Sequence, residues 1–236
     1  MKKWIIWTSL ALAAMVSACN DDGLDVITVV DSNFETGTDK WTAEFAEYDT
    51  TTVDSTLTMK FAQSRLPTGL DTSQHAFMIQ STNRSDDMFM YLKKKVTGFV
   101  PNGTYAVQFD INLATNYPAS SVGAGGSPGS SVYLKAGASA SEPARKLVKS
   151  FYQFTLDKGQ QSEGGTDALV LGDVASGRED TKYALVKRSN SGRPFTVKAA
   201  SNGEIWLFVG TDSGYEGLTK LYYDRITVTI HEQQIN

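Results

Sequence analysis

Residues 104–113 read TYAVQFDINL, and apolar side chains occupy every second position of this stretch. The alternating apolar set is Tyr105, Val107, Phe109, Ile111 and Leu113. A side-chain period of two is that of a β-strand with one buried face. The turn-forming sequence VPNG at 100–103 comes directly before it. The stretch therefore predicts a strand that packs one face against a core.

Similar short apolar or alternating runs recur along the chain, and helical periodicity is almost absent. The further predicted strands are 57–61, 76–80, 88–96, 131–136, 168–172, 183–187, 195–199, 204–210 and 221–230. Clusters of Gly, Asn, Asp and Ser separate them. About ten such strands predict an all-β fold, an antiparallel β-sandwich or barrel.

Three stretches are predicted to be loops: 116–130, 157–167 and 211–217. The first is rich in Gly and Ser, and we expect it to be mobile. A loop of this length within a compact domain is either functional or disordered. The sequence shows no internal repeat and no second domain boundary, so residues 31–236 are expected to form a single domain.

The N-terminus has the pattern of a secretory signal. Met1 and two lysines precede an apolar run from Trp4 to Val16. This run is too short to span a membrane, which needs roughly 20 apolar residues. The following residues, Ser17-Ala18-Cys19, complete a sequence that resembles the lipobox of bacterial lipoproteins. The resemblance implies that residues 1–18 are a cleaved signal peptide, that Cys19 carries lipid, and that residues 19–30 are a tether.

Cys19 is the only cysteine in the chain. An intrachain disulfide is therefore excluded, and an exposed tether offers no base that would lower the pKa of a catalytic thiol. The alternative is a plain secretory signal followed by an incidental cysteine. The adjacent residues 20–22, NDD, resemble the surface-export signal of Bacteroidota lipoproteins. We expect the protein to lie at the bacterial outer membrane or cell surface, held to the membrane by the lipid alone.

The charge balance argues against one class of partner. The chain has 22 basic and 26 acidic side chains, and removal of residues 1–18 leaves 20 basic ones. Nucleic-acid binding requires a basic face that meets the phosphates, so no nucleic-acid partner is expected.

Few residues offer catalytic chemistry. His75 and His231 are the only histidines, and neither lies in a hydrolase motif. Glycosidases need only two carboxylates, and the chain has many in its predicted loops. These are Asp86, Asp87, Glu163, Asp167, Asp173, Glu179, Asp180, Asp212 and Glu216. No apolar setting distinguishes any of them as a general acid, so enzymatic activity is the less favoured alternative.

One acid stands out in the last predicted strand. The alternation over 222–230 places Asp224 on the same face as Tyr222 and Ile226. A carboxylate on a core face must be paired, hydrogen-bonded or bound to a metal. Two interpretations stay open: a structural Asp paired with Arg225 or a backbone amide, or a calcium ligand at the rim of the sandwich.

Two short motifs carry a family resemblance. Residues 33–35, NFE, are followed by Trp41, and the closing strand reads YYDRITV at 222–228. This combination resembles the galactose-binding-like jelly rolls of carbohydrate-binding modules. The resemblance implies a jelly-roll sandwich in which Glu35 and Asp224 hold a structural calcium. The long Gly/Ser insertion departs from the family pattern, and sugar-stacking aromatic residues have no counterpart that can be matched.

Aromatic residues are the candidate ligand contacts. The segment 204–209, EIWLFV, is apolar on both faces, so the strand is either covered on both sides or presents Trp206 at a groove. An aromatic ring can stack on the apolar face of a sugar, although core packing is the more common role of such residues. Trp41, Tyr117 and Tyr215 are equally ambiguous, and Tyr215 is expected to be the best exposed.

The function that we expect from these features is that of a non-catalytic, lipid-anchored protein with a glycan-binding jelly roll. The alternatives are a structural or adhesin-like surface protein that binds another protein and, less favoured, a carboxylate-dependent glycan-active enzyme.

Overall fold

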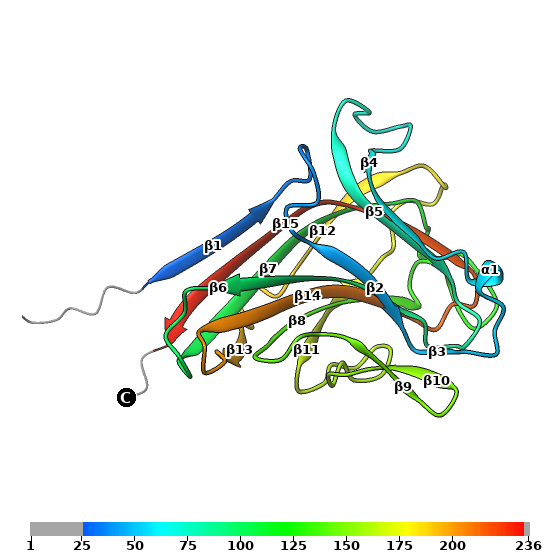
Figure 1. The fold of residues 1–236 in the computed structure, drawn as a ribbon. Helices are drawn as coiled ribbons and strands as arrows, with labels where there is room; N and C mark the ends of the chain where they lie inside the picture. The colour runs from blue at the N-terminus through cyan, green and yellow to red at the C-terminus, as the bar shows by residue number, and fades with distance from the viewer. Residues whose placement is uncertain (1–25, 234–236) are drawn as a thin grey trace, which may run out of the picture.

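The stretch at 104–113 forms most of strand β7 (Thr104–Thr115), which lies inside the larger of two antiparallel sheets (Figure 1). In the computed structural model, which describes residues 26–233, the apolar set of β7 is buried and the alternating residues are half-buried. The predicted one-sided strand is confirmed.

Two sheets make up the sandwich. The larger has the order β12–β7–β15–β5–β4, with β13 paired to β7 and β1 paired to β15. Its other strands are β1 (Ile27–Ser32), β4 (Lys60–Arg65), β5 (His75–Thr82), β12 (Ala184–Ser189), β13 (Phe195–Lys198) and β15 (Leu218–Gln233). The second sheet has the order β11–β8–β14–β6–β2. Its strands are β2 (Thr42–Ala46), β6 (Phe89–Thr97), β8 (Val132–Ser139), β11 (Ala168–Asp173) and β14 (Glu204–Ser213).

The strand order is that of a jelly roll. The four central strands of the larger sheet run β5–β15–β7–β12, and those facing them run β6–β14–β8–β11. Two such four-stranded sheets, connected through Greek keys, define the jelly-roll sandwich. The all-β, antiparallel fold class is therefore confirmed. The core lies between the sheets, where Phe109 and Ile111 of one sheet and Leu207 and Val209 of the other belong to one buried cluster.

Several elements differ from the sequence expectations. The strand predicted at 57–61 is present only from Lys60, where β4 begins, and Leu57 is instead the last residue of the short helix α1 (Asp54–Leu57). Strand β1 begins at Ile27, whereas the domain was expected to begin at residue 31. Its six residues pair with β15, so the ends of the described chain are joined in one sheet.

Strand β15 contains a bulge that changes which residues face the core. Its register with β7 shifts between Tyr223 and Arg225, at Asp224. Because a one-residue insertion reverses the alternation, Tyr223 and Ile226 both belong to the main core, whereas Tyr222 packs in a separate small cluster. The expectation that Tyr222 and Ile226 share a face is therefore wrong, and Asp224 is the half-buried residue at the bulge.

A third, small sheet covers part of the outer face of the second sheet. It has the order β3–β10–β9, with β3 (Tyr48–Asp49), β9 (Arg145–Val148) and β10 (Phe151–Phe154) (Figure 1). Phe154 packs edge-on against three rings of the second sheet, those of Phe89, Tyr91 and Phe208. The two large sheets therefore share one core, and the small sheet closes a second one.

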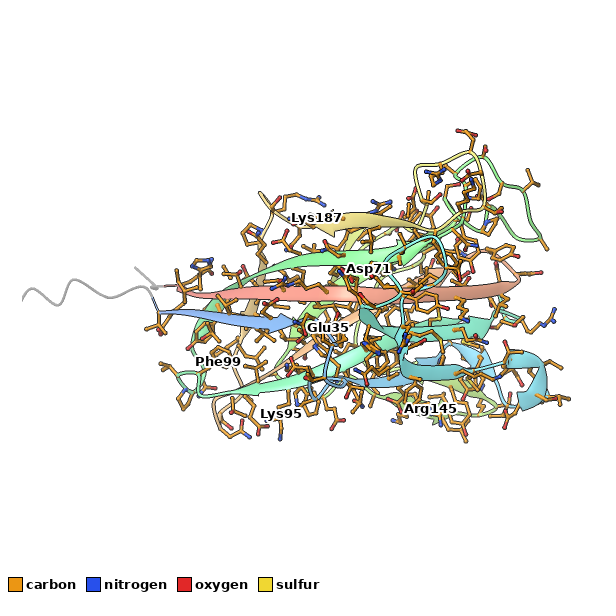
Figure 2. All side chains as sticks on the ribbon, turned by 90° about the horizontal axis from the view of Figure 1, so that it is seen from above. Glu35, Asp71, Lys95, Phe99, Arg145 and Lys187 are labelled. Atoms are coloured by element: carbon orange, nitrogen blue, oxygen red, sulfur yellow. The ribbon has the colours of Figure 1, made fainter. Side chains whose placement is uncertain are left out.

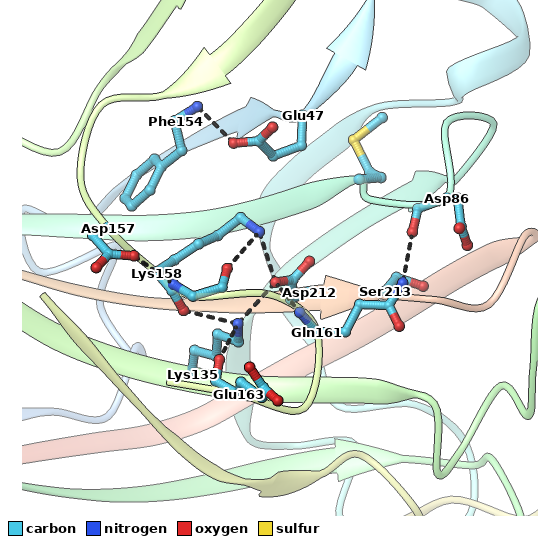
Figure 3. A network of polar contacts seen from close by, with 12 residues as sticks. Glu47, Asp86, Lys135, Phe154, Asp157, Lys158, Gln161, Glu163, Asp212 and Ser213 are labelled. Carbon is cyan, nitrogen blue, oxygen red and sulfur yellow. Dashed lines mark hydrogen bonds and ion pairs between the residues drawn. The ribbon is translucent and has the colours of Figure 1, made fainter. Parts of the chain in front are cut away.

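A buried ion triad holds the loop after β10 against the second sheet (Figure 3). Asp212 Oδ2 accepts hydrogen bonds from Lys158 Nζ at 2.7 Å, Lys135 Nζ at 2.9 Å and the Gln161 amide at 3.0 Å. The side chains of Lys135 and Asp212 have no exposed surface. Burial lowers the pKa of the Lys135 ammonium, and the charge of Asp212 opposes that shift.

The expectation that Asp212 is a solvated loop charge is therefore wrong. Strand β14 continues to Ser213, so Asp212 lies in the strand, and the loop from Leu156 to Asp167 closes over it. Lys135 Nζ also donates to the carbonyl oxygens of Lys158 and Glu163 in this loop, at 2.8 and 2.9 Å.

Replacement of Asp212 tests the triad. Asp212→Asn leaves two ammonium groups without a counter-ion in a dry site, and loss of one partner of a buried ion pair costs about 3–5 kcal/mol. We expect urea unfolding to show a loss of stability of that order. The matched control is Asp180→Asn, which removes an exposed partner of Arg178 and should change stability little. Equal stability of the two variants would contradict the role given to the triad.

Candidate functional site

A groove lies on the outer face of the second sheet, beyond the end of the small covering sheet. Its volume is about 470 Å³. Strands β2, β6 and β14, with the segments before β2 and after β8, supply its lining, which consists of Lys40, Thr42, Lys93, Lys95, Thr97, Glu142 and Trp206. The groove therefore combines one large aromatic ring with hydroxyl, ammonium and carboxylate groups.

Trp206 is partly exposed because the small sheet that covers Phe208 does not extend as far as Trp206. Trp206 and Phe208 point to the same side of β14, away from the main core. The ring of Phe208 is fully buried and lies 5.3 Å from that of Phe154, whereas Trp206 is only half-buried. The two outcomes considered for this strand both occur: Phe208 is covered, and Trp206 lines a groove.

Ion pairs hold the lysines around the groove. Lys93 Nζ donates to Glu44 at 3.2 Å, to Glu142 at 2.8 Å and to the Pro143 carbonyl at 2.8 Å, so all three of its protons are in use. Lys95 pairs with Glu204 at 3.0 Å, and its ammonium lies 5.7 Å from the centroid of the Trp206 ring.

The hydrogen bond from Lys95 is also the main reason why the pKa of Glu204 is below its usual value. The polar residues of the groove were not among the predicted ligand contacts. Their signal in the sequence was the alternation of Lys93, Lys95 and Thr97, which gives β6 one polar outer face at this end.

Trp41 lies in the core and not at the groove. Its side chain is 1% exposed, and its indole N–H donates to Ser32 Oγ at 3.0 Å. The Lys94 ammonium lies 5.9 Å from the ring centroid. The ring of Trp41 therefore presents no free face on which a ligand could stack.

Tyr117 belongs to the Gly/Ser loop 116–130, and Tyr215 lies where this loop packs, at another end of the sandwich. The Tyr117 hydroxyl donates to the Leu218 carbonyl at 3.2 Å and accepts from the Lys220 amide at 2.8 Å. Burial raises the pKa of Tyr117 to about 12. The ring of Tyr215 lies so close to Gly123 that a Cβ there would come within 2.4 Å of it.

The contacts of the Gly/Ser loop overturn the expectation that it is mobile. The loop and the residue after it pair with the segment after β14 through hydrogen bonds from Glu216 N to Ala124 O at 2.8 Å and from Gly214 N to Ser131 O at 2.9 Å. The expected mobile loop is instead a docked one, and Tyr215 beneath it is half-buried, as Tyr117 and Trp206 are.

The two predicted calcium ligands have different surroundings. Both carboxylate oxygens of Glu35 lie within hydrogen-bond distance of the His75 amide, at 3.1 and 3.2 Å, and its Oε2 lies 3.3 Å from His75 Nδ1. Asp224 is half-buried at the bulge of β15, and its pKa is raised mainly by burial and further by the charge of Glu35.

Glu35 and Asp224 alone would supply only part of the calcium shell that the prediction requires. Calcium takes six to eight oxygen ligands, and residues 26–233 contain no group of three or more His, Cys, Asp or Glu side chains arranged around one point. Backbone carbonyls and water would have to complete the shell around Glu35 and Asp224. The calcium site stays a prediction.

A second hollow, of about 220 Å³, lies beside the ion triad and is lined in part by Glu47, Asp87 and Lys158. Burial raises the pKa of both Glu47 and Asp87, and the charge of Asp212 raises both further. Glu47 Oε1 also accepts a hydrogen bond from the Phe154 amide at 2.8 Å. The expectation that none of the loop acids lies in a setting that raises its pKa is therefore wrong for Asp87. Glu47 was not among the predicted site residues, because the residues that surround it come from distant strands.

Comparison with known proteins finds likeness of structure only. No protein-family model matches the sequence, and no curated protein sequence matches it. One similar structure is the K3 cleaved adhesin domain of Lys-gingipain from Porphyromonas gingivalis, with a TM-score of 0.40 and 15% identity over 86% of this chain and 99% of that one.

Two other similar structures have different functions. A carbohydrate-binding module specific for non-crystalline cellulose has a TM-score of 0.36 and 10% identity over 82% of this chain and 90% of that one. The enzymatically active domain of a bacteriophage CBA120 tailspike protein has a TM-score of 0.35 and 10% identity over 83% of this chain, which spans only 20% of the phage chain. An adhesin domain, a carbohydrate-binding module and an enzymatically active domain are therefore similar to this chain with nearly equal TM-scores.

Chelation tests the predicted calcium. If Glu35 and Asp224 hold the ion, EDTA should lower the melting temperature, because a ligand that binds only the folded state stabilises it. Asp224→Asn should abolish the difference between the curves with and without EDTA. Identical melting curves of the unaltered protein under both conditions would contradict the prediction.

Proposed function

We propose that the chain is a non-catalytic glycan-binding protein of the bacterial cell envelope, with the Trp206 groove as its binding site. The observation that supports this most directly is a half-buried tryptophan that lines a groove on a sheet face where Phe89, Tyr91 and Phe208 are buried. An indole ring left partly in water at a groove is a natural platform for a ligand with a flat apolar face.

The rest of the groove suits a sugar. A pyranose ring has one apolar face of C–H groups and a periphery of hydroxyl groups, which donate and accept hydrogen bonds. Trp206 supplies the apolar platform, Thr42 and Thr97 supply hydroxyl groups, and Glu142 supplies an acceptor. The groove therefore offers both an apolar surface and hydrogen-bonding groups, which are the two kinds of contact that a pyranose ring can make.

The alternative functions rest on other features. A surface protein that binds another protein would use the exposed loops. A glycan-active enzyme would use Glu47 and Asp87, whose raised pKa values are those of candidate general acids. We favour binding because the aromatic platform lies in a different hollow from this carboxylate pair.

Two aromatic variants test the proposed site. Trp206→Ala should weaken retention of the protein in affinity gels that contain the recognised glycan about tenfold or more, because stacking of a nucleic-acid base on an aromatic ring contributes about 1–3 kcal/mol and we expect a comparable contribution here. Tyr215→Ala should retain binding, since its ring packs beneath the Gly/Ser loop. Loss of binding in Tyr215→Ala but not in Trp206→Ala would contradict the site.

The enzyme alternative has its own test. If the protein releases shortened glycan from a polymer and Glu47→Gln does not, the result would favour the enzyme over the binding protein.

The envelope location is proposed from the N-terminal sequence. Residues 1–25, which include Cys19, lie outside the described residues. Within residues 26–233, no helix is both long and apolar enough to cross a membrane. The lipobox-like sequence before Cys19 and the following NDD are what support lipid anchoring and export to the surface.

Replacement of the cysteine tests the anchor. In a host that processes bacterial lipoproteins, the full chain should partition into detergent and incorporate labelled fatty acid, whereas Cys19→Ala should do neither, because it removes the thiol that is acylated. Fatty-acid incorporation by Cys19→Ala would contradict the proposed attachment point.

A further inference from the structure

The Trp206 groove adjoins a further hollow at the edge of the sandwich, which we call the edge hollow. This hollow, of about 380 Å³, lies between β1 and β6, and it shares Lys40, Lys95 and Thr97 with the groove. The two hollows therefore form one elongated depression, with the two lysines at the junction. A depression of this shape accommodates several units of a linear chain and not only one ring.

The charges in the depression are compensated unequally. Lys93 is saturated by two carboxylates and a carbonyl. In the edge hollow, Asp39 is paired with Lys94 at 2.7 Å, and Asp31 is paired with Arg225. The hydrogen bond from Arg225 holds the pKa of Asp31 below its usual value. The acidic groups of this hollow are therefore already bound to cations of the protein.

Two ammonium groups remain available to a ligand. Lys40 is exposed and has no ion-pair partner among residues 26–233, and Lys95 pairs only with Glu204 while 45% of its side chain is exposed. Lys40 also lies at the second of two consecutive left-handed positions, with φ values of 47° at Asp39 and 63° at Lys40. Such backbone is uncommon for residues other than Gly, and it sets the direction in which Lys40 leaves the turn before β2.

The positive junction contrasts with the rest of the molecule. The chain has a formal net charge of −4, and two hollows beside the ion triad are lined in part by Glu47, Asp86, Asp87, Asp157 and Glu163, with Lys158 as their one cation. A negatively charged ligand is therefore disfavoured at these acidic hollows and attracted at the junction.

We propose that the depression binds an acidic oligosaccharide, with Lys40 and Lys95 contacting its carboxylate or sulfate groups while an adjacent sugar ring stacks on Trp206. This inference rests on the proposed function and adds the chemical class of the glycan to it. Lys95 lies beside the Trp206 ring, so one sugar on the indole brings the acidic group of its neighbour to the two ammonium groups.

Matched pairs of polymers test the charge requirement. Affinity electrophoresis would compare polygalacturonate with its carboxyl-reduced form, and dextran sulfate with dextran, so that the carboxylate and sulfate arms each have a neutral control. We expect at least one acidic polymer to bind about tenfold or more tightly than its neutral counterpart. We also expect the difference to shrink as salt is raised from about 0.01 to 0.15 M.

Variants separate the site from general attraction. The double variant Lys40→Gln/Lys95→Gln should lose the preference for the acidic polymer. The matched double variant Lys182→Gln/Lys187→Gln has the same net charge and alters exposed lysines at and before β12, and it should keep the preference. Figure 2 shows Lys187 on the side of the molecule opposite to Lys95. Trp206→Ala, which changes no charge, should weaken binding of the acidic polymer.

Each result has one meaning. Equal binding of acidic and neutral polymers, or loss of the preference in both double variants, would overturn the inference and leave the proposed function standing. Acidic binding that survives in Trp206→Ala would show attraction without a site and would also overturn it. Failure of every glycan to bind, neutral ones included, would overturn the proposed function itself.

Discussion

The arrangement of the outer face of the second sheet depends on a single buried carboxylate. Asp212 holds two ammonium groups and one amide with one oxygen, while its Oδ1 has no hydrogen-bond partner among residues 26–233. Charged groups removed from water are stable only when they are paired. The loop that brings Lys158 must therefore close over Lys135 and Asp212, and this loop directly follows β10, which carries Phe154. The ion triad and the aromatic cover are parts of one closure.

The same closure determines where a ligand can bind. Phe154 covers the rings of Phe89, Tyr91 and Phe208, and the small sheet ends before it reaches Trp206. The outer face is thus divided into a packed half, with an acidic rim around the ion triad, and an open half with Trp206 and the lysines of β6. Figure 2 shows Lys95 and Arg145 along the same long side of the molecule, with Lys95 nearer the end that contains Phe99. The sequence alone does not show which half of the outer face is packed and which is open, because both halves belong to the same strands.

Features that depend on neighbouring residues in the sequence could be predicted, whereas features that depend on contacts between separate segments could not. Strand β7 was predicted because its alternation already reports a core face, and β14 was predicted from a short run that is apolar on both faces. The bulge at Asp224 was not, since it is a property of the pairing between β15 and β7. Trp206 was correctly singled out as an aromatic residue on a strand with two apolar faces. Trp41 and Tyr215 had equally suitable side chains, yet the residues that contact their rings belong to other segments: Ser32 of β1 and Lys94 of β6 for Trp41, and Gly123 of the Gly/Ser loop for Tyr215.

The sequence by itself determined the fold class, because a period of two in side-chain polarity is a local property that only a half-buried strand satisfies. It also carried the signal-like segment and the lipobox-like residues before Cys19, which are read without any fold. The tertiary structure alone decided which aromatic ring remains exposed, which acids are desolvated and which lysines are left without partners. Each of these depends on a contact between strands or loops that are distant in the chain, and burial and charge compensation exist only once those segments have come together.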